Sequence, residues 1–202
     1  MTLVLKNARS AAFSLEKYKV LLYYINIRVF LKEKVVIYMN IVLIEPEIPQ
    51  NTGNIARTCA ATHTPLHIVK PMGFTVDDKK LKRAGLDYWY MLDITYYENY
   101  AQFYESHKDC ELHFFTTKGK RVHSDVKYGP DAYLIFGKET AGIDEHILKE
   151  NMHRCARIPM YGEARSLNLS NSVAVALYEA LRQNDYAGLK LKGKLHNIED
   201  DD

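Results

Sequence analysis

The chain has 202 residues, of which 47% are hydrophobic and 26% charged, with only 10 glycines and 6 prolines. This is an ordinary globular composition, which excludes a disordered, collagen-like or coiled-coil protein. The 27 lysines and arginines nearly balance the 25 acidic residues, so the net charge of +2 gives no argument for a nucleic-acid partner.

The three cysteines, Cys59, Cys110 and Cys155, lie far apart and form no C-x-x-C motif. Such a set favours neither a disulfide framework nor a thiolate zinc site, and it indicates a reducing, cytoplasmic compartment. No apolar tract approaches the roughly 18 residues of a membrane span, so no membrane association is expected. A proline between His63 and His67 breaks the helix that would bring both to one metal, and no metal site is predicted.

From Met39 onward, short apolar runs alternate with stretches of helical character. The apolar runs predict strands at 40–45, 66–70, 111–117, 131–136 and 154–159. The intervening and following stretches predict helices at 52–62, 77–84, 97–107, 144–151 and 170–184. This alternation predicts a doubly wound α/β domain around a buried parallel sheet.

The two ends of the chain do not follow this plan. Residues 1–38 carry seven lysines and arginines against two acids and contain neither glycine nor proline. They can be an upstream extension ahead of a true start at Met39, a genuine added helix or a targeting segment. We therefore divide the chain into an N-terminal extension (1–38), one domain (39–189) and an acidic, solvated tail (190–202).

Three predicted strands run at their carboxyl ends into glycine-containing loops. These loops are 115–119 (FTTKG), 136–142 (FGKETAG) and 158–162 (IPMYG). Ligands of open α/β sheets bind at this edge, and although one such loop can be an ordinary turn, three together favour a pocket. The glycine spacing matches neither the dinucleotide-binding motif nor the P-loop, so the sequence does not support those ligands.

A polar cluster precedes the last predicted helix, in residues 163–172 (EARSLNLSNS). Ser170 or Asn171 can cap that helix, whereas Arg165, Ser166 and Asn168 are left unexplained by capping.

A second polar cluster lies in residues 51–61 (NTGNIARTCAA), where Asn51, Asn54 and Arg57 recur at helical spacing. Asn51 can be an N-cap. A guanidinium on a largely buried helix needs an anionic partner, and its planar set of donors fits a phosphate. Arg57 is therefore predicted to bind a phosphate.

Five motifs occur in order along residues 39–189. They are IVLIEPEIPQNTGNIARTCA, PMGFTVDDKKLKRAGLDYW, FFTTKG, YLIFGKETAGI and RIPMYGEARSLNLSNSVAVALYEALRQ. With them the segment resembles, nearly end to end, the YibK-like (TrmL) tRNA 2'-O-methyltransferases of the SPOUT class. The resemblance implies a homodimer and a three-layer α/β fold with a parallel sheet and a deep C-terminal trefoil knot, which periodicity would not predict.

The resemblance also implies an activity. The enzyme would transfer a methyl group from S-adenosylmethionine to the ribose 2'-hydroxyl of the wobble nucleotide, cytidine or uridine 34, in the anticodon loop of leucine tRNAs. Methylation of ribosomal RNA or of another tRNA position is one alternative. A knotted RNA-binding protein without catalysis is another.

The site residues are carried over from the resemblance. Cofactor binding is expected at Phe115, Thr116, Gly137, Glu139, Gly142, Ile158, Met160, Ser166 and Leu167. Catalysis is expected at Arg57, Ser166 and Asn168, and substrate binding at Asn51, Asn54, Arg57 and Arg165. Because a guanidinium hardly deprotonates, Arg57 is interpreted as a phosphate clamp that stabilises the developing alkoxide, with water or that phosphate assisting proton removal. Ser166 and Asn168 would position the cofactor and the ribose.

Overall fold

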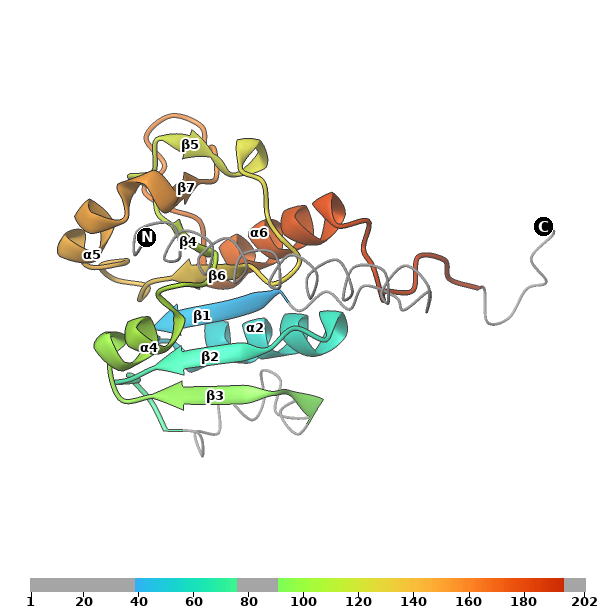
Figure 1. The fold of residues 1–202 in the computed structure, drawn as a ribbon, viewed down its shortest axis with the longest axis horizontal. Helices are drawn as coiled ribbons and strands as arrows, with labels where there is room; N and C mark the ends of the chain where they lie inside the picture. Colours follow the sequence, from blue (N-terminus) through green and yellow to red (C-terminus); the bar gives the residue numbers. More distant parts are fainter. Residues whose placement is uncertain (1–38, 76–90, 195–202) are drawn as a thin grey trace, which may run out of the picture. The chain divides into compact units, whose positions relative to one another are not determined.

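The computed structural model describes residues 39–75 and 91–194. Within them, seven strands form one sheet in the order β3-β2-β1-β6-β4-β7-β5, and every neighbouring pair runs parallel (Figure 1). The strands are β1 (Asn40–Ile44), β2 (Leu66–Val69), β3 (Ile94–Tyr97), β4 (Leu112–Phe115), β5 (Arg121–Val122), β6 (Tyr133–Phe136) and β7 (Cys155–Arg157). The helices are α2 (Pro49–Thr62), α4 (Tyr100–His107), α5 (Glu145–Glu150) and α6 (Leu169–Gln183), with short 3-10 turns η2 (His123–Asp125) and η3 (Met152–Arg154). The predicted parallel α/β fold is confirmed.

All five predicted strands are present as β1, β2, β4, β6 and β7. The pattern misses β3 and β5 because β3 is largely exposed and β5 is two exposed residues long, so neither has a buried apolar run. The helix predicted at 97–107 is shorter than expected: Tyr97 ends β3, and Asn99 caps α4 by accepting from the Gln102 backbone N–H. The helix predicted at 77–84 lies outside the described residues.

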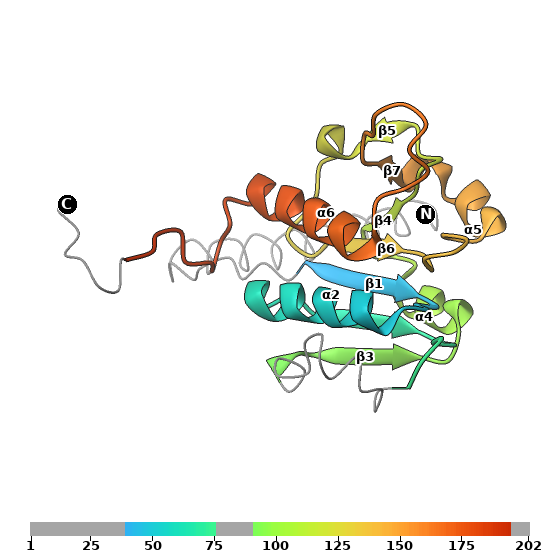
Figure 2. The same ribbon diagram turned by 180° about the vertical axis from the view of Figure 1, so that it is seen from behind.

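The sheet is covered by helices on both faces. Successive residues of a strand point to opposite sides. Ile41 and Leu43 of β1 accordingly pack in the cluster that holds α2 and α6, whereas Val42 and Ile44 pack in the cluster that holds α4 and α5. Figure 2 shows α2 and α6 side by side on their face of the sheet. The three layers implied by the resemblance are therefore present.

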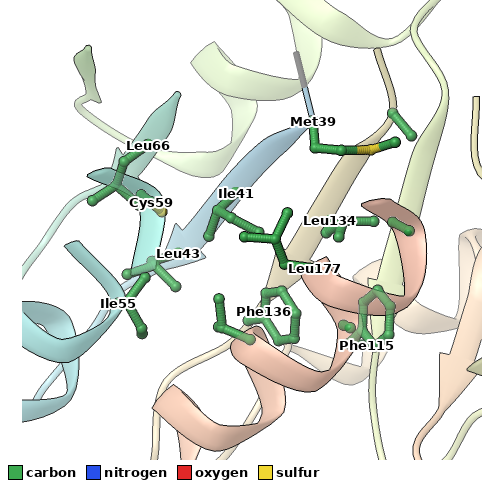
Figure 3. Close-up of a cluster of buried hydrophobic side chains, with 14 of the residues drawn as sticks. Met39, Ile41, Leu43, Ile55, Cys59, Leu66, Phe115, Leu134, Phe136 and Leu177 are labelled. Atoms are coloured by element: carbon green, nitrogen blue, oxygen red, sulfur yellow. The ribbon is translucent and has the colours of Figure 1, made fainter. Parts of the chain in front are cut away.

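The layer between the sheet and α6 is closely packed. Figure 3 shows Ile41 of β1 and Leu134 and Phe136 of β6 meeting Leu177 of α6. The other buried residues of α6 include Ala176, which is fully buried. Small helix residues of this kind let α6 approach both the sheet and α2, as dense interior packing requires.

Among the described helices, none combines the length and apolarity needed to cross a bilayer.

On the other face, a buried histidine of β2 forms two hydrogen bonds. The Asn40 Oδ1 atom can only accept, so it takes the proton of His67 Nε2 at 3.2 Å, and Nδ1 accepts from the Tyr97 hydroxyl at 2.9 Å. Both bonds fit a neutral imidazole. Burial, and then the nearby His107, lowers the pKa of His67 to about 4.

We expect this histidine to make the fold sensitive to acid. The pKa of His67 is lower in the folded than in the unfolded state. Its contribution to the free energy of unfolding is therefore complete above about pH 6.5 and is lost as the pH falls toward 4. The free energy of unfolding should therefore fall by about 2 kcal/mol from this group between pH 7 and pH 5. Urea denaturation at both pH values measures it. His67→Gln should remove this part of the pH dependence, and an unchanged dependence would contradict the assignment.

Candidate functional site

A cavity of about 560 Å³ opens beyond the carboxyl ends of β4, β6 and β7. This volume is typical of small-molecule sites. Its walls come from the three glycine-containing loops and from the first turns of α2 and α6. All nine residues expected to bind the cofactor line it: Phe115, Thr116, Gly137, Glu139, Gly142, Ile158, Met160, Ser166 and Leu167.

The apolar part of the wall includes a pair of aromatic rings. Phe115 of β4 and Phe136 of β6 stack with their centroids 4.8 Å apart and their planes 15° apart. Both rings are nearly buried, and both line the cavity. Ile158 and Leu167 add aliphatic surface from the loop after β7. The cavity can therefore take a flat, partly apolar ligand.

The loop after β6 folds tightly on itself. The Gly142 N–H donates to the Lys138 carbonyl at 2.8 Å, and Gly142 has a φ of +71°, which favours glycine. A Cβ on Gly137 would lie only 2.1 Å from the Gly142 carbonyl carbon. Gly137 is therefore required for the loop to close on its own backbone. A substitution at Gly137 would therefore disturb the loop itself, whether or not a ligand is bound.

Glu139 of this loop caps a helix that lies far away in the sequence. The N-cap residue of α2 is Ile48, which has no capping side chain. The Glu139 carboxylate instead accepts from the backbone N–H groups of Glu47 at 2.8 Å and Ile48 at 3.2 Å, and from Asn51 Nδ2 at 2.9 Å. A negative charge is favourable at a helix N-terminus. The loop after β6 is thereby fixed to the start of α2.

The attachment between these two loops is reciprocal. The Glu47 carboxylate accepts from the Thr140 N–H at 3.1 Å and from the Thr140 hydroxyl at 2.8 Å. Lys138 forms an ion pair with Glu45 at 2.8 Å. Glu45 and Glu47, in the segment before α2, thus both bind the loop after β6.

A third loop joins through side-chain amides. Asn168 Nδ2 donates to Asn51 Oδ1 at 2.9 Å. Asn168 Oδ1 accepts from the Ser170 N–H at 2.9 Å and the Ser170 hydroxyl at 2.7 Å, which makes Asn168 the N-cap of α6. Glu139, Asn51 and Asn168 therefore connect the first turns of α2 and α6 to the loop after β6.

These contacts correct three sequence interpretations of helix caps. Asn51 lies within α2 and is not its N-cap, which is Ile48. The N-cap of α6 is Asn168, not Ser170 or Asn171. Asn168, which we considered unexplained by capping, is therefore explained by it. The signal was the Asn-x-Ser sequence at 168–170, since asparagine is a preferred N-cap residue.

The candidate RNA-binding residues are divided between two places. Asn51 and Arg165 line the cavity. Asn54 and Arg57 are exposed on α2 and do not line it. Half of the residues of α2 are buried, but Arg57 itself is exposed, so burial of its guanidinium gives no argument for an anionic partner.

The lining offers few groups that could accept a proton. Glu139 is the single carboxylate among the described lining residues, which include no histidine, and its oxygens are occupied by the cap. No group of histidine, cysteine and acidic side chains suited to a metal occurs in the described residues. Lys118, Lys138 and Ile48, which the sequence analysis did not single out, also line the cavity. Lys118 and Lys138 lie inside the predicted loops, so their position in those loops could have indicated that they line the cavity.

Comparison with known sequences identifies the family. The sequence model of the SpoU rRNA Methylase family matches residues 38–178. The chain belongs to the SpoU rRNA methylase family. A relative, the tRNA (cytidine(34)-2'-O)-methyltransferase of Escherichia coli (strain K12), is 50% identical over 155 residues, covering 76% of this chain and 99% of that protein.

Solved structures agree with this SpoU assignment. One, described as "Structural insights into the 2-OH methylation of C/U34 on tRNA", matches with a TM-score of 0.70 and 42% identity, covering 73% of this chain and 97% of that one. The SpoU methyltransferase AviRb of Streptomyces viridochromogenes, in complex with AdoMet, matches with a TM-score of 0.65 and 24% identity. It covers 74% of this chain and 58% of that one and shows the shared fold alone. The predicted family and fold class are confirmed, and the knot stays a prediction.

We expect Glu139→Gln, which keeps the size of the side chain, to weaken the attachment of the loop after β6 to the start of α2. The amide has one acceptor oxygen instead of two, so one backbone N–H at the start of α2 loses its partner, at a cost of about 1–3 kcal/mol. Thermal unfolding and calorimetric titration with S-adenosylhomocysteine measure stability and ligand affinity. Both should fall.

Glu145→Gln is a matched control, because Glu145, the first residue of α5, is exposed and forms only a surface ion pair with Lys118. It should leave stability nearly unchanged, since exposed ion pairs contribute little. Equal losses in the two variants would contradict the capping role of Glu139.

Proposed function

We propose that this protein is a tRNA 2'-O-methyltransferase that acts on the ribose of nucleotide 34, cytidine or uridine, in the anticodon loop. One observation carries the proposal: in a chain 50% identical to the tRNA (cytidine(34)-2'-O)-methyltransferase of Escherichia coli, all nine residues expected to bind the cofactor line one cavity at the carboxyl ends of β4, β6 and β7. Leucine tRNAs are the expected substrates, on the basis of the resemblance.

The cavity suits S-adenosylmethionine as the methyl donor. Its volume, its stacked phenylalanines and the aliphatic Ile158 and Leu167 fit a purine nucleoside. The backbone of the loop after β6 offers polar groups beside them. We infer that the nine lining residues named above hold the cofactor. When bound, it supplies a methyl group on a positively charged sulfur.

The chain's own contribution is alignment. A ribose hydroxyl is a weak nucleophile, so it must be held in line with the methyl group, and its charge must be stabilised as the proton leaves. Because the one lining carboxylate is occupied by the helix cap, we infer that water or a substrate phosphate takes the proton. Ser166 and Asn168 position the cofactor and the ribose, Asn168 as the N-cap of α6 and the partner of Asn51.

Arg57 supports a homodimer. It is exposed on α2 and does not line the cavity of its own chain, which supports its placement at the cavity of a second copy. The exposed Val175 and Tyr178 on α6 supply apolar surface for such a partner. In this arrangement Arg57, with Asn51, Asn54 and Arg165, binds the substrate and stabilises the developing alkoxide.

The extent of the domain and its location are further proposals. The family match spans residues 38–178, which supports a methyltransferase domain that begins near residue 39. We propose that this domain extends to residue 189 and that 1–38 and 190–202 are additions to it. Cys59, Cys110 and Cys155 are free thiols, which supports a reducing, cytoplasmic location.

The activity is tested by transfer of labelled methyl groups from S-adenosylmethionine to total tRNA, followed by nuclease mapping. We expect label on the ribose of nucleotide 34 and no requirement for added metal. Label on a base, on another ribose or on ribosomal RNA alone would contradict the proposal. Cofactor binding without transfer to any RNA would support the non-catalytic alternative.

Arg57→Ala should reduce methyl transfer at least 100-fold, because the developing charge loses a preorganised donor, whereas S-adenosylhomocysteine affinity should stay within about twofold. Mixing this variant with Leu167→Trp, which blocks the cavity, tests the dimer. A mixed dimer contains one intact cavity facing one intact Arg57, so activity should reappear. Absence of recovery, with mixed dimers demonstrated, would place Arg57 at its own cavity or outside catalysis.

A further inference from the structure

A concentration of positive charge lies at the β5 edge of the sheet. The segments 112–124 and 152–162 contain no acidic residue, although the whole chain is nearly balanced at +2. They hold five cations, Lys118, Lys120, Arg121, Arg154 and Arg157, which we call the basic edge. Strand β5 is the last strand of the sheet, and β7 is its neighbour.

The backbone that carries the basic edge is firmly held against β7. The Thr116 N–H donates to the Ala156 carbonyl at 3.0 Å, and the Arg157 guanidinium donates to the Thr117 carbonyl. A Cβ on Gly119 would lie 2.7 Å from the carbonyl carbon of Ala156, so the turn passes directly over the β7 backbone. A partner of the basic edge would therefore not have to order this turn on binding, which lowers the cost of association.

The charges of the basic edge are exposed and only partly neutralised. Lys118 pairs with Glu145, and 51% and 78% of these two side chains are exposed, so water weakens the pair. Lys120 and Arg121 are exposed and form no ion pair with any residue in 39–75 or 91–194. The edge therefore presents a net positive surface.

The basic edge is continuous with the cavity, because Lys118 and its neighbours Thr116 and Thr117 line the cavity wall. Charge on an exposed edge strand can also serve to prevent strand-to-strand aggregation. That role does not account for Lys120, which precedes β5. A second purpose for the charge is needed.

We propose that the basic edge binds the phosphate backbone of the RNA substrate, beside the cavity that holds the reacting ribose. Lysine and arginine side chains supply the sequence-independent part of RNA affinity through phosphate contacts. The inference rests on the proposed function and adds a docking surface to it. It differs from the expectation that Asn51, Asn54, Arg57 and Arg165 bind the substrate.

The test compares Lys120→Ala, Arg121→Ala and the double variant with the wild type. We expect each single variant to bind tRNA about threefold more weakly at 0.1 M salt and the double variant about tenfold more weakly. The slope of log K against log salt concentration should shrink by about one for each cation removed. Affinity for S-adenosylhomocysteine should not change, and the maximal rate at saturating tRNA should stay within twofold.

Lys190→Ala is the matched control. Lys190 is exposed and follows α6, which begins at the cavity and runs about 22 Å away from it over its 15 residues. It should leave tRNA affinity and the salt slope unchanged. An equal loss in this control would mean that the effect is general charge.

Two outcomes separate this inference from the proposed function. If the wild-type enzyme methylates nucleotide 34 but the double variant keeps wild-type tRNA affinity and salt slope, the basic edge does not bind RNA. If that variant instead aggregates, as sedimentation would show, while its soluble fraction binds tRNA normally, the charge protects the strand edge and the inference is overturned. Failure of the wild type to methylate tRNA would overturn the proposed function itself.

Discussion

The carboxylate of Glu139 is the interaction on which the site depends. It is the cap that α2 lacks locally, and it is supplied by the loop that forms one wall of the cavity. Because the same group serves the start of a helix and a loop of the cavity wall, it holds these two segments together. The cavity is therefore a product of tertiary contacts between segments about 90 residues apart. Its shape is set before any ligand arrives.

This arrangement constrains how the chemistry can proceed. A carboxylate with every oxygen engaged cannot serve freely as a base, and no histidine lines the cavity among the described residues. A site of this kind accelerates a reaction by orientation and by stabilising charge. Orientation and charge stabilisation suffice in principle for transfer from an electrophilic methyl donor, because the acceptor hydroxyl needs only to be aligned and to lose its proton. The arginine proposed to help stabilise that charge is exposed on α2, so the proposed dimer would have a direct part in activity.

Sequence patterns predicted the central strands of the sheet because buried strands appear in the sequence as short apolar runs. Strands such as β1 are apolar on both faces and bounded by turn residues, and the glycine loops that follow β4, β6 and β7 meet at one edge in any parallel sheet. The pattern could not reveal the partner of Glu139, because a cap supplied from a distant loop has no local spacing. For the same reason Asn51 was misread as an N-cap. Exposed strands β3 and β5 were missed because they exist only through pairing with their neighbours.

One chain of hydrogen bonds passes from the start of α6 through Asn51 to Glu139, and its members all donate in the same direction. The Ser170 hydroxyl donates to Asn168, the Asn168 amide donates to Asn51, and the Asn51 amide donates to Glu139. The anion at the end fixes the direction, because it cannot donate, and so it decides how each amide is turned. A chain of dipoles aligned in this way polarises cooperatively. The Glu139 carboxylate at the start of α2 thus orients the amide that caps α6, so the starts of both helices depend on one anionic group.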